Sequence, residues 1–401
     1  MKTIIIGAGA SGLSCAITLA KRGGDVLVLE KLSLSAKKIL VTGNGRCNYW
    51  NDNFNNENFY SGNKMFIEEV NTLENRKGVL TFFDNLGIVP NIKNGYYYPY
   101  SMQASSIRDS LLFECKRLGI KIINDFDVVN VLKSDNKFIV KSIDKYYEAD
   151  SLIIATGSYA YYKDKTSGYN LCRKFGHKIN AVLPSLVQLV GKDDFYKDWQ
   201  GVRSNVKVSI YVNGDLKKEE TGEIMLTDYG ISGICVFNLS GIANRALYNN
   251  DKVSVKIDFL PEIDDLKSFF DNRNNIISKR RMIDFFQGLI NDKLVKIILL
   301  RSNISYDKYY DDLNDLEKDR LSEVIKKFYV EIIESKSYDN AQVCTGGVNV
   351  DEVNPNTMES KLCSNLYIIG EVLDVDGVCG GFNLGFAWLS GIIAGRSVKV
   401  D

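Results

Sequence analysis

The sequence predicts an α/β protein in which one parallel-sheet domain is interrupted by a β-rich insert and a small helical insert. Apolar runs without polar alternation at residues 3–6, 26–29 and 151–155 are typical of strands buried on both faces. Residues 183–260 instead indicate alternating strands, and residues 261–327 indicate helices with charged faces. The chain is therefore expected to be a layered domain that two insertions split in the middle.

The C-terminal segment resumes the first pattern. An apolar strand at residues 365–369 precedes a final helix from Asn383, and strands also return at residues 328–333 and 341–344. The predicted division is residues 1–183 for the first part of the layered domain, 184–260 for the β-rich insert, 261–327 for the helical insert, 328–343 for the return of the β-rich insert, and 344–401 for the second part of the layered domain.

The other elements follow from local signals. Residues 31–63 are rich in Gly, Asn and Lys and predict a long loop. The further elements expected along the chain are a helix at 64–86, a strand at 95–98 stopped by Pro99, a helix capped by Ser101 and running to 118, a strand at 121–123, a hairpin of 128–132 and 137–143 around Asp135-Asn136, strands at 207–212 and 223–227 with a turn at Asn213-Gly214, and a helix at 231–247.

A glycine-rich turn joins the first strand to the first helix. Its sequence is Gly7-Ala8-Gly9-Ala10-Ser11-Gly12, a G-x-G-x-x-G pattern. Gly7 allows the tight turn, Gly9 lets the backbone approach a pyrophosphate, and Gly12 permits close packing of helix and strand. Glu30 lies 18 residues beyond Gly12, at the end of the second strand, where its carboxylate can accept both hydroxyls of an adenosine ribose. Together these elements predict a dinucleotide site.

Composition excludes several functional classes. The 401 residues carry 50 Lys+Arg and 50 Asp+Glu, so no basic footprint for nucleic acid or an anionic membrane is expected. No apolar run is long enough for a membrane span, and the apolar N-terminus fits a strand better than a signal peptide. The eight cysteines form no CxxC pair, which favours reduced thiols in a cytoplasmic protein. The single histidine, His177, argues against a histidine-ligated metal site and a Ser-His hydrolase, and no metal is expected.

The C-terminal block indicates which dinucleotide is bound. The strand at residues 366–369 ends in Gly370-Glu371, where single-domain flavoproteins carry a carboxylate to the ribityl hydroxyls of FAD. The pair Gly380-Gly381 then precedes an apolar helix, whose N-terminal amides could stabilise the anionic edge of a reduced flavin. An ordinary strand-turn-helix would explain this block alone. With the N-terminal fingerprint present, we expect FAD.

The chain resembles the BaiN-type family of NAD(P)/FAD-dependent oxidoreductases, also labelled aminoacetone-oxidase-like. The motifs that carry the resemblance are Gly7–Gly12, Lys38-Ile39-Leu40 with 43–48, Ala155-Thr156-Gly157, 230–233, 346–348, 354–361 and 370–384. The resemblance implies a Rossmann-like FAD-binding domain of the glutathione-reductase-2 type, a β-barrel-like insert and a small helical insert. It also implies a substrate pocket where the inserts cover the flavin.

Three segments depart from the family pattern. Tyr49-Trp50-Asn51 replaces the usual residues after the Gly-Arg-Cys-Asn motif, and residues 94–99 alter the usual Asn-Gly-Arg before a Phe-Pro segment. Asp228 stands where the family often has a histidine. Because these changes fall in expected pocket segments, the cofactor transfers from the resemblance more firmly than the substrate does.

The expected cofactor-binding residues come from the fingerprints and the family motifs. They are Gly7, Gly9, Ala10, Ser11, Gly12, Glu30, Lys31, Lys38, Gly43, Gly45, Arg46, Cys47, Asn48, Val128, Ala155, Thr156, Gly157, Gly370, Glu371, Asp376, Gly381, Phe382, Asn383 and Leu384.

The catalytic residues are not identified by the sequence, and Arg46, Tyr97 and Asp228 are the candidates. Arg46 could fix flavin or substrate or anchor its loop, and Tyr97 could donate a proton or only pack in a strand. Cys47 and Cys379 could form a redox pair, although small buried packing residues are the better interpretation. His177 could act as a single acid/base, but a capping role at a helix C-terminus is the favoured interpretation.

The leading functional hypothesis is an FAD-dependent oxidoreductase that moves a hydride between the flavin and a small organic substrate. One form is reduction of an activated C=C bond in an unsaturated 3-oxo steroid or bile-acid-like compound, as the resemblance suggests, with NAD(P)H as a transient reductant. The alternatives are an amine oxidase using O2, a flavin redox sensor without turnover, and a tRNA-modifying flavoenzyme, against which zero net charge counts. Partners other than a small molecule are not expected, and the oligomeric state is left open.

Overall fold

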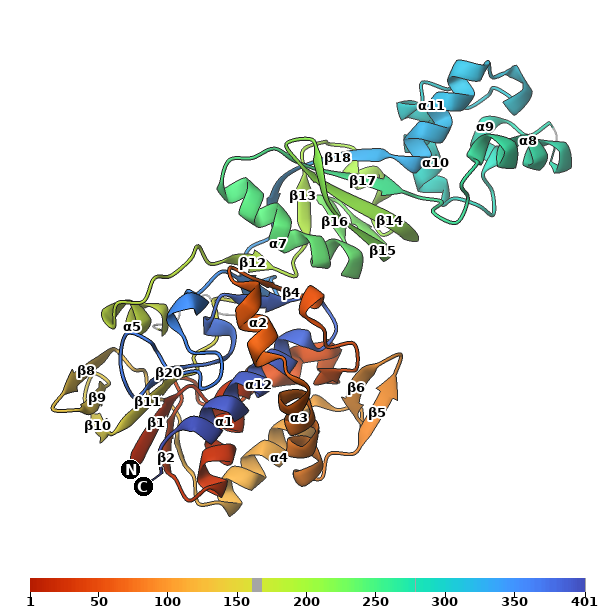
Figure 1. Cartoon of the computed structure of the whole chain (residues 1–401). Helices are drawn as coiled ribbons and strands as arrows, with labels where there is room; N and C mark the ends of the chain where they lie inside the picture. Colours follow the sequence, from red (N-terminus) through yellow and green to blue (C-terminus); the bar gives the residue numbers. More distant parts are fainter. Residues whose placement is uncertain (161–167, 278, 401) are drawn as a thin grey trace. The chain divides into compact units, whose positions relative to one another are not determined.

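The computed structural model describes residues 1–160, 168–277 and 279–400. The chain divides into two compact units (Figure 1). The split unit comprises Met1–Val182 and Val343–Asp401, and the insert unit comprises Leu183–Gln342. The finer five-part division predicted above remains a prediction.

The split unit is built on a parallel sheet in the strand order β20-β11-β1-β2-β7. Its strands are β1 (Lys2–Ile6), β2 (Asp25–Leu29), β7 (Lys121–Ile123), β11 (Ser151–Ile154) and β20 (Leu366–Ile368). Ile5 pairs with Val28 on one side and Ile153 on the other, and all three are fully buried. Strands covered on both faces can be apolar at every position, which is why these runs show no alternation. The predicted Rossmann-type α/β fold is confirmed.

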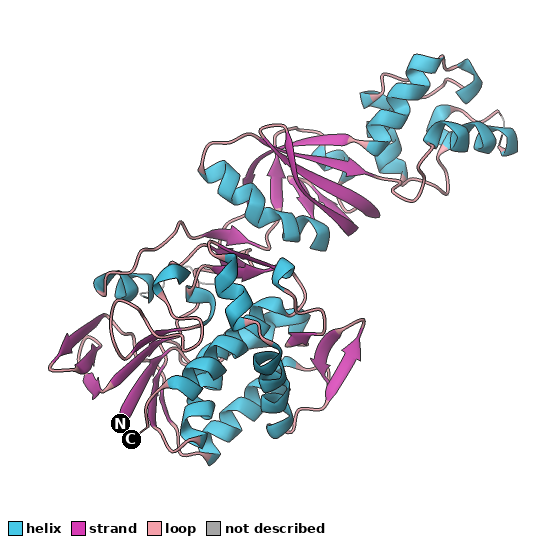
Figure 2. Cartoon of the chain, in the orientation of Figure 1, coloured by secondary structure: helices cyan, strands magenta, loops and turns pink. Residues whose placement is uncertain are grey.

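The remaining elements of the split unit surround this sheet (Figure 2). The helices are α1 (Ala10–Lys21), α2 (Lys64–Val70), α3 (Leu73–Asn85), α4 (Ala104–Arg117), α5 (Gly168–Lys174) and α12 (Phe382–Ser397), with shorter 3-10 turns η1 (Lys37–Gly45), η2 (Asn56–Asn58), η4 (Val350–Glu352) and η5 (Gly370–Val372). The other strands are β3 (Trp50–Asn51), β4 (Phe59–Ser61), β5 (Pro90–Lys93), β6 (Tyr96–Pro99), β8 (Asn130–Ser134), β9 (Lys137–Lys141), β10 (Tyr146–Ala149), β19 (Val343–Thr345) and β21 (Val375–Gly377).

Four local predictions for this unit were wrong. The helix expected at 64–86 is two helices, because Asn71 ends α2 and the Thr72 hydroxyl accepts from the Asn75 amide to begin α3. Gln103, not Ser101, precedes α4, and the Ser101 hydroxyl bonds that of Ser106 instead. The loop expected at 31–63 contains η1, β3, η2 and β4, and Pro99 is the last residue of β6 and not the residue after it. Short elements stabilised by tertiary contacts leave little periodicity in the sequence.

Helices α1 and α12 lie side by side over the sheet (Figure 1). Glycines of α12 make this approach possible. A Cβ on Gly391 would lie 2.2 Å from Ser14 Oγ and 2.4 Å from the Ser11 carbonyl oxygen, and one on Gly395 would lie 2.8 Å from the Cys15 carbonyl oxygen. The contact brings the N-terminal fingerprint helix against the C-terminal block.

Gly391→Leu is expected to destabilise the split unit by about 3 kcal/mol, because a larger side chain cannot enter this helix contact without moving backbone. Urea unfolding followed by circular dichroism measures the change. Arg396→Leu is the matched control, since Arg396 is an exposed residue of the same helix. Equal stability of the two variants would show that the contact between α1 and α12 tolerates a side chain.

The insert unit contains a closed antiparallel barrel in the order β13-β16-β15-β14-β17-β18. Its elements are β12 (Leu183–Ser185), β13 (Leu189–Gly191), β14 (Arg203–Val212), β15 (Asp215–Thr227), β16 (Gly230–Ser232), β17 (Val253–Asp258) and β18 (Phe328–Ser335), with α6 (Tyr196–Trp199) and α7 (Ile234–Tyr248). Asn213 and Gly214 have φ of +51° and +90°, so the predicted turn joins β14 to β15. The helix expected at 231–247 starts later, because β16 uses residues up to Ser232 to pair with β15. The predicted β-barrel insert is confirmed.

The helical part of the insert unit shares one hydrophobic core cluster with the barrel. It comprises α8 (Leu266–Ile276), α9 (Met282–Phe285), α10 (Asp292–Arg301), η3 (Tyr310–Asp312) and α11 (Asp315–Lys326). Phe270 contacts the rings of Phe285, Phe286 and Tyr310 at centroid distances of 5.6–6.3 Å. Charged side chains of these helices, including Asp271, Asp315 and Asp319, are exposed, as the pattern predicted.

Candidate flavin and nucleotide site

The glycine turn after β1 is shaped by backbone crowding. Gly7 has φ of +107°, and a Cβ there would lie 2.4 Å from the Ala155 carbonyl oxygen. A Cβ on Gly12 would lie 2.0 Å from the Gly7 carbonyl oxygen, whereas one on Gly9 would meet nothing within 4 Å. Two glycines are therefore required by the fold, while Gly9 leaves open space where a ligand could approach.

The N-terminus of α1 presents amides to that space. Gly9 is the N-cap residue, no side chain of the described residues caps the helix, and Ala10 and Ser11 lie in its first turn. Uncapped N–H groups together with the helix dipole favour an anion such as a pyrophosphate.

Glu30 lies against the same turn. Its carboxylate accepts hydrogen bonds from the Ala8 amide at 2.7 Å and the Leu32 amide at 2.9 Å. Burial raises the pKa of Glu30, although the backbone amides counteract it. The neighbouring Lys31 pairs with Asp127 at 3.2 Å, and Val128 is buried just before β8. The structure thus brings the predicted ribose-binding acid to the glycine turn.

Residues 36–48 form a tightly turned loop. Gly43, Gly45 and Cys47 have φ of +54°, +80° and +57°. Arg46 is exposed, whereas Cys47 is fully buried, and burial raises the pKa of its thiol to about 12. A thiol that stays protonated fits packing better than redox chemistry. Cys379 is half-buried, and neither cysteine is in a disulfide.

The N-terminus of α12 faces this loop. Gly381 is its N-cap with φ of +93°, and a Cβ there would lie 2.9 Å from Asn48 Oδ1. That oxygen is buried without a hydrogen-bond partner among the described residues. Phe382 and Leu384 are in the first turn, and the Asn383 side chain bonds the N–H and C=O of Gly377, each at 2.8 Å. The N-terminus of α12 therefore presents backbone amides without a side-chain cap beside the Asn48 oxygen, which can still accept a hydrogen bond.

A third segment follows β11. Ala155 touches Gly7, Thr156 Oγ1 is buried without a partner among the described residues, and Gly157 has φ of +70°. A Cβ on Gly157 would lie 4.0 Å from Glu371 Oε2. Gly370, with φ of +75°, lies beside Ser11 of α1. These contacts bring the ends of β1, β11 and β20 together at one edge of the sheet.

The Glu371 carboxylate is fixed by contacts that the sequence analysis did not predict. Its carboxylate contacts Lys38 Nζ at 2.7 Å and Ser158 Oγ at 2.7 Å. Ser158 was not among the predicted site residues, although its hydroxyl directly follows the predicted site residues Thr156 and Gly157. Asn51 was also missed as a site residue, and its Nδ2 donates to the Gly380 carbonyl at 2.8 Å. The predicted Asp376 is buried in β21.

The three catalytic candidates do not all belong to the same unit. Tyr97 donates its hydroxyl hydrogen to Asp52 Oδ1 at 2.7 Å, and burial together with Asp52 raises the pKa of Tyr97 to about 12. Arg46 lies in the same unit as Tyr97. Asp228 is exposed at the turn between β15 and β16 of the insert unit. Their catalytic roles stay predictions.

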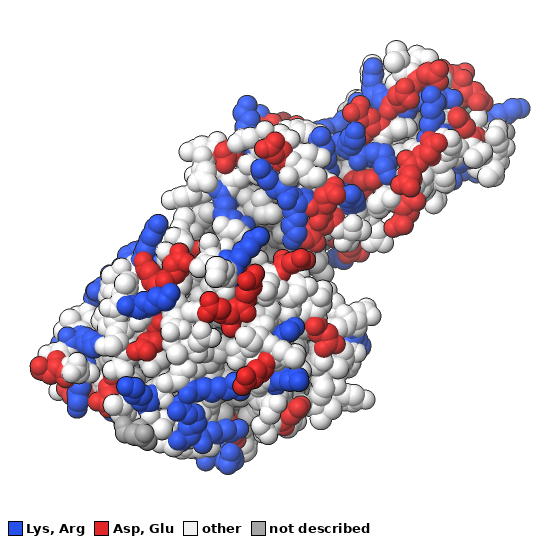
Figure 3. All heavy atoms as spheres, viewed as in Figure 1, with Lys and Arg blue, Asp and Glu red and all other residues white. Residues whose placement is uncertain are grey.

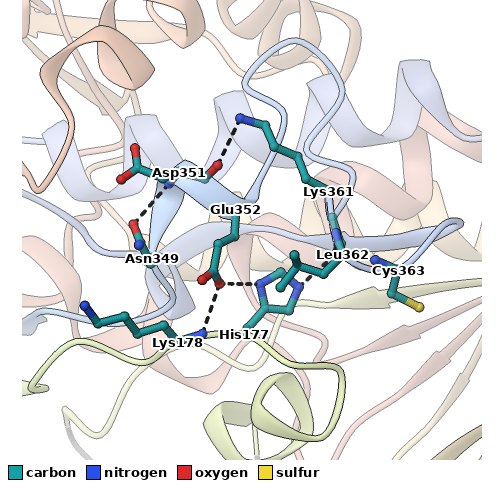
Figure 4. A network of polar contacts seen from close by, with 9 residues as sticks. His177, Lys178, Asn349, Asp351, Glu352, Lys361, Leu362 and Cys363 are labelled. Carbon is teal, nitrogen blue, oxygen red and sulfur yellow. Dashed lines mark hydrogen bonds and ion pairs between the residues drawn. The ribbon is translucent and has the colours of Figure 1, made fainter.

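His177 is buried within a network of polar contacts (Figure 4). Its backbone amide bonds the Cys172 carbonyl to close α5, so the predicted capping role belongs to its backbone. The side chain instead joins Glu352, at 3.0 Å from Nδ1, to Ser360, at 2.8 Å from Nε2. Because Ser360 Oγ already accepts from the Leu362 and Cys363 amides, its hydrogen points to Nε2, and His177 is the neutral tautomer protonated on Nδ1.

These residues fit FAD. A dinucleotide carries a pyrophosphate, hydroxyls and a polar ring, and the structure has features suited to each. The open space at Gly9 and the two helix N-termini without a side-chain cap suit the pyrophosphate and other negative charge. The two carboxylates suit the hydroxyls, and the Asn48 oxygen without a partner among the described residues suits the ring. The Gly9 turn and Glu30 would hold the adenosine half, while Glu371, Asn48 and the amides of α12 would hold the flavin half.

The comparison with protein families decides the identity. The family model described as HI0933-like protein Rossmann domain matches residues 1–397. This chain belongs to the HI0933-like family. The resemblance inferred from the sequence motifs is thereby confirmed, and with it the broad class of FAD-dependent oxidoreductase.

Curated relatives of this HI0933-like chain match along its length. It is 36% identical over 399 residues to the 3-dehydro-bile acid delta(4,6)-reductase of Clostridium scindens, covering 98% of both chains. It is 27% identical over 406 residues to the ribosomal RNA dihydrouridine synthase of Haemophilus influenzae, covering 99% of this chain and 98% of that protein.

A solved structure shares the fold of the HI0933-like chain. The 3-ketosteroid-Δ4-(5α)-dehydrogenase from Rhodococcus jostii RHA1, in complex with 4-androstene-3,17-dione, matches with a TM-score of 0.51 and 14% identity. The match covers 98% of this chain and 96% of that chain, and it concerns the fold alone.

The HI0933-like chain has a mixed surface. Positive and negative side chains are interspersed on the face in Figure 3, in keeping with the equal totals of 50 each. Within the described ranges, the structure has no helix with the length and apolarity of a membrane span. The same residues contain no cluster of three or more His, Cys, Asp or Glu side chains suited to a metal ion.

Proposed function

We propose that the chain reduces a carbon–carbon double bond conjugated to a ketone, in a steroid-like or bile-acid-like molecule, with FAD as cofactor and NAD(P)H as the source of electrons. The observation that supports this most is the 36% identity, over 98% of both chains, to a 3-dehydro-bile acid reductase. The net reaction adds one hydride and one proton across the double bond, while the nicotinamide is oxidised.

FAD, when bound, supplies the group that accepts and passes on the hydride. The amides at the N-termini of α1 and α12 are proposed to bind its negative charges, and Glu30 and Glu371 its hydroxyls. The Asn48 oxygen is proposed to accept a hydrogen bond from the flavin ring. Tyr97 is the proposed proton donor, and its hydroxyl would turn from Asp52 Oδ1, to which it donates at 2.7 Å, toward the substrate.

The experiment is an anaerobic absorbance titration of the flavin-loaded protein with NADH and then NADPH. We expect the flavin band to bleach and to recover when an unsaturated 3-oxo steroid is added. A flavin that stays oxidised with both nucleotides would overturn NAD(P)H-driven reduction and favour amine oxidation or a sensor role. Failure of the protein to bind FAD after reconstitution would overturn the whole proposal.

A second candidate is reduction of a pyrimidine C=C bond in ribosomal RNA. It is favoured by the relative of that activity, which aligns with 99% of this chain. The lower identity and the balanced surface charge count against it. In the same titration, a ribosomal RNA transcript in place of the steroid distinguishes the candidates, because only the true substrate reoxidises the flavin rapidly.

A further inference from the structure

The Glu371 carboxylate is held from three segments that lie far apart in the chain. Lys38 Nζ contacts Oε2 at 2.7 Å. Ser158 Oγ donates to Oε1 at 2.7 Å, and the Cys344 amide donates to the same oxygen at 3.2 Å. A carboxylate with both oxygens engaged is fixed in one orientation.

This network lies at the carboxyl ends of β11 and β20. Ser158 follows β11, Glu371 follows β20, and Gly370 touches Ser11 in the first turn of α1. Ligands of open α/β sheets bind at this edge. The Glu371 carboxylate is therefore held at the same edge of the sheet as the glycine turn that is proposed to bind the nucleotide.

The ion pair is only partly open to solvent. The exposed fraction is 26% for the Lys38 side chain and 18% for that of Glu371, while Ser158 is buried. A charge that is partly withdrawn from water is screened less than a surface charge. Removal of Lys38 would therefore leave the negative charge of Glu371 felt by neighbouring groups.

We propose that Lys38 and Ser158 are positioning residues for Glu371, and that Lys38 adjusts the affinity and reduction potential of the flavin through the charge of this carboxylate. This rests on FAD binding as proposed above. Lys38 balances the negative charge of Glu371, so a flavin that gains negative charge on reduction lies beside a neutral ion pair. Without Lys38, the unbalanced Glu371 carboxylate repels the reduced flavin and disfavours its reduction. Without both Lys38 and the Glu371 charge, that repulsion is absent.

The test compares Lys38→Met with Lys37→Met, a matched control because Lys37 is the exposed neighbour of the same type. The FAD dissociation constant is measured by fluorescence, and the midpoint potential by dye equilibration. We expect Lys38→Met to bind FAD about tenfold more weakly than the control and to have a lower potential. The double variant K38M/E371Q should return the potential toward that of the wild type.

A merely structural lysine would leave the potential unchanged, so equal potentials and affinities of Lys38→Met and Lys37→Met would overturn the inference. If Lys38→Met does not fold, Lys38→Arg and Ser158→Ala replace it. Lys38→Arg should keep the potential and Ser158→Ala should weaken FAD binding, and an unchanged Ser158→Ala affinity would contradict the positioning role. Absence of FAD binding by the wild type would instead defeat the proposed function.

Discussion

Gly12→Ala is expected to destabilise the split unit by about 3 kcal/mol or more and to abolish FAD binding. The added Cβ would lie 2.0 Å from the Gly7 carbonyl oxygen, a collision between two backbone segments that no rotamer relieves. Relief requires α1 to move away from β1, which also displaces the helix amides that are proposed to bind the pyrophosphate of FAD. Urea unfolding and FAD titration measure the two effects.

Gly9→Ala is the matched variant for this prediction. Its Cβ would meet no protein atom within 4 Å, so its stability should stay within about 1 kcal/mol of the wild type. Its FAD affinity should nevertheless fall about tenfold or more, because the methyl group would occupy the open space in which the pyrophosphate is proposed to bind. Normal FAD affinity in Gly9→Ala would place the dinucleotide elsewhere.

His177→Ala is expected to cost about 3 kcal/mol, because it leaves a cavity, removes one of the hydrogen-bond partners of Glu352 and removes the acceptor of the buried Ser360 hydroxyl hydrogen. Lys178→Ala is the matched control, since Lys178 is exposed and only its backbone amide contacts Glu352. Unfolding in urea at pH 7.5 compares the two variants. A loss no larger than that of the control would show that the network contributes little.

The same histidine should make stability depend on pH. Burial lowers the pKa of His177 more than Glu352 raises it. The unfolded chain therefore takes up the proton first as the pH falls, and the contribution of His177 is present above pH of about 6.5 and lost below it. Unfolding curves from pH 7.5 to 5 should show this decline in the wild type and less of it in His177→Ala. Parallel curves would exclude His177 as the titrating group.

The sequence by itself determined the elements whose signals are local. The buried strands, the glycine turn and the acid at Glu30 follow from apolar runs, glycine positions and spacing, and they predicted the Rossmann-type sheet and the dinucleotide. The turn at Asn213-Gly214 followed in the same way, because its residues tolerate positive φ.

Only the tertiary structure decided how distant residues meet. The contacts of Glu371 with Lys38 and Ser158, and of His177 with Ser360, join positions between 183 and 333 residues apart, which no local pattern can report. The break at Thr72 was likewise hidden, because both flanking helices have similar apolar spacing. Strand and helix formation depends on neighbours along the chain, whereas the orientation of a functional side chain depends on partners that folding brings together.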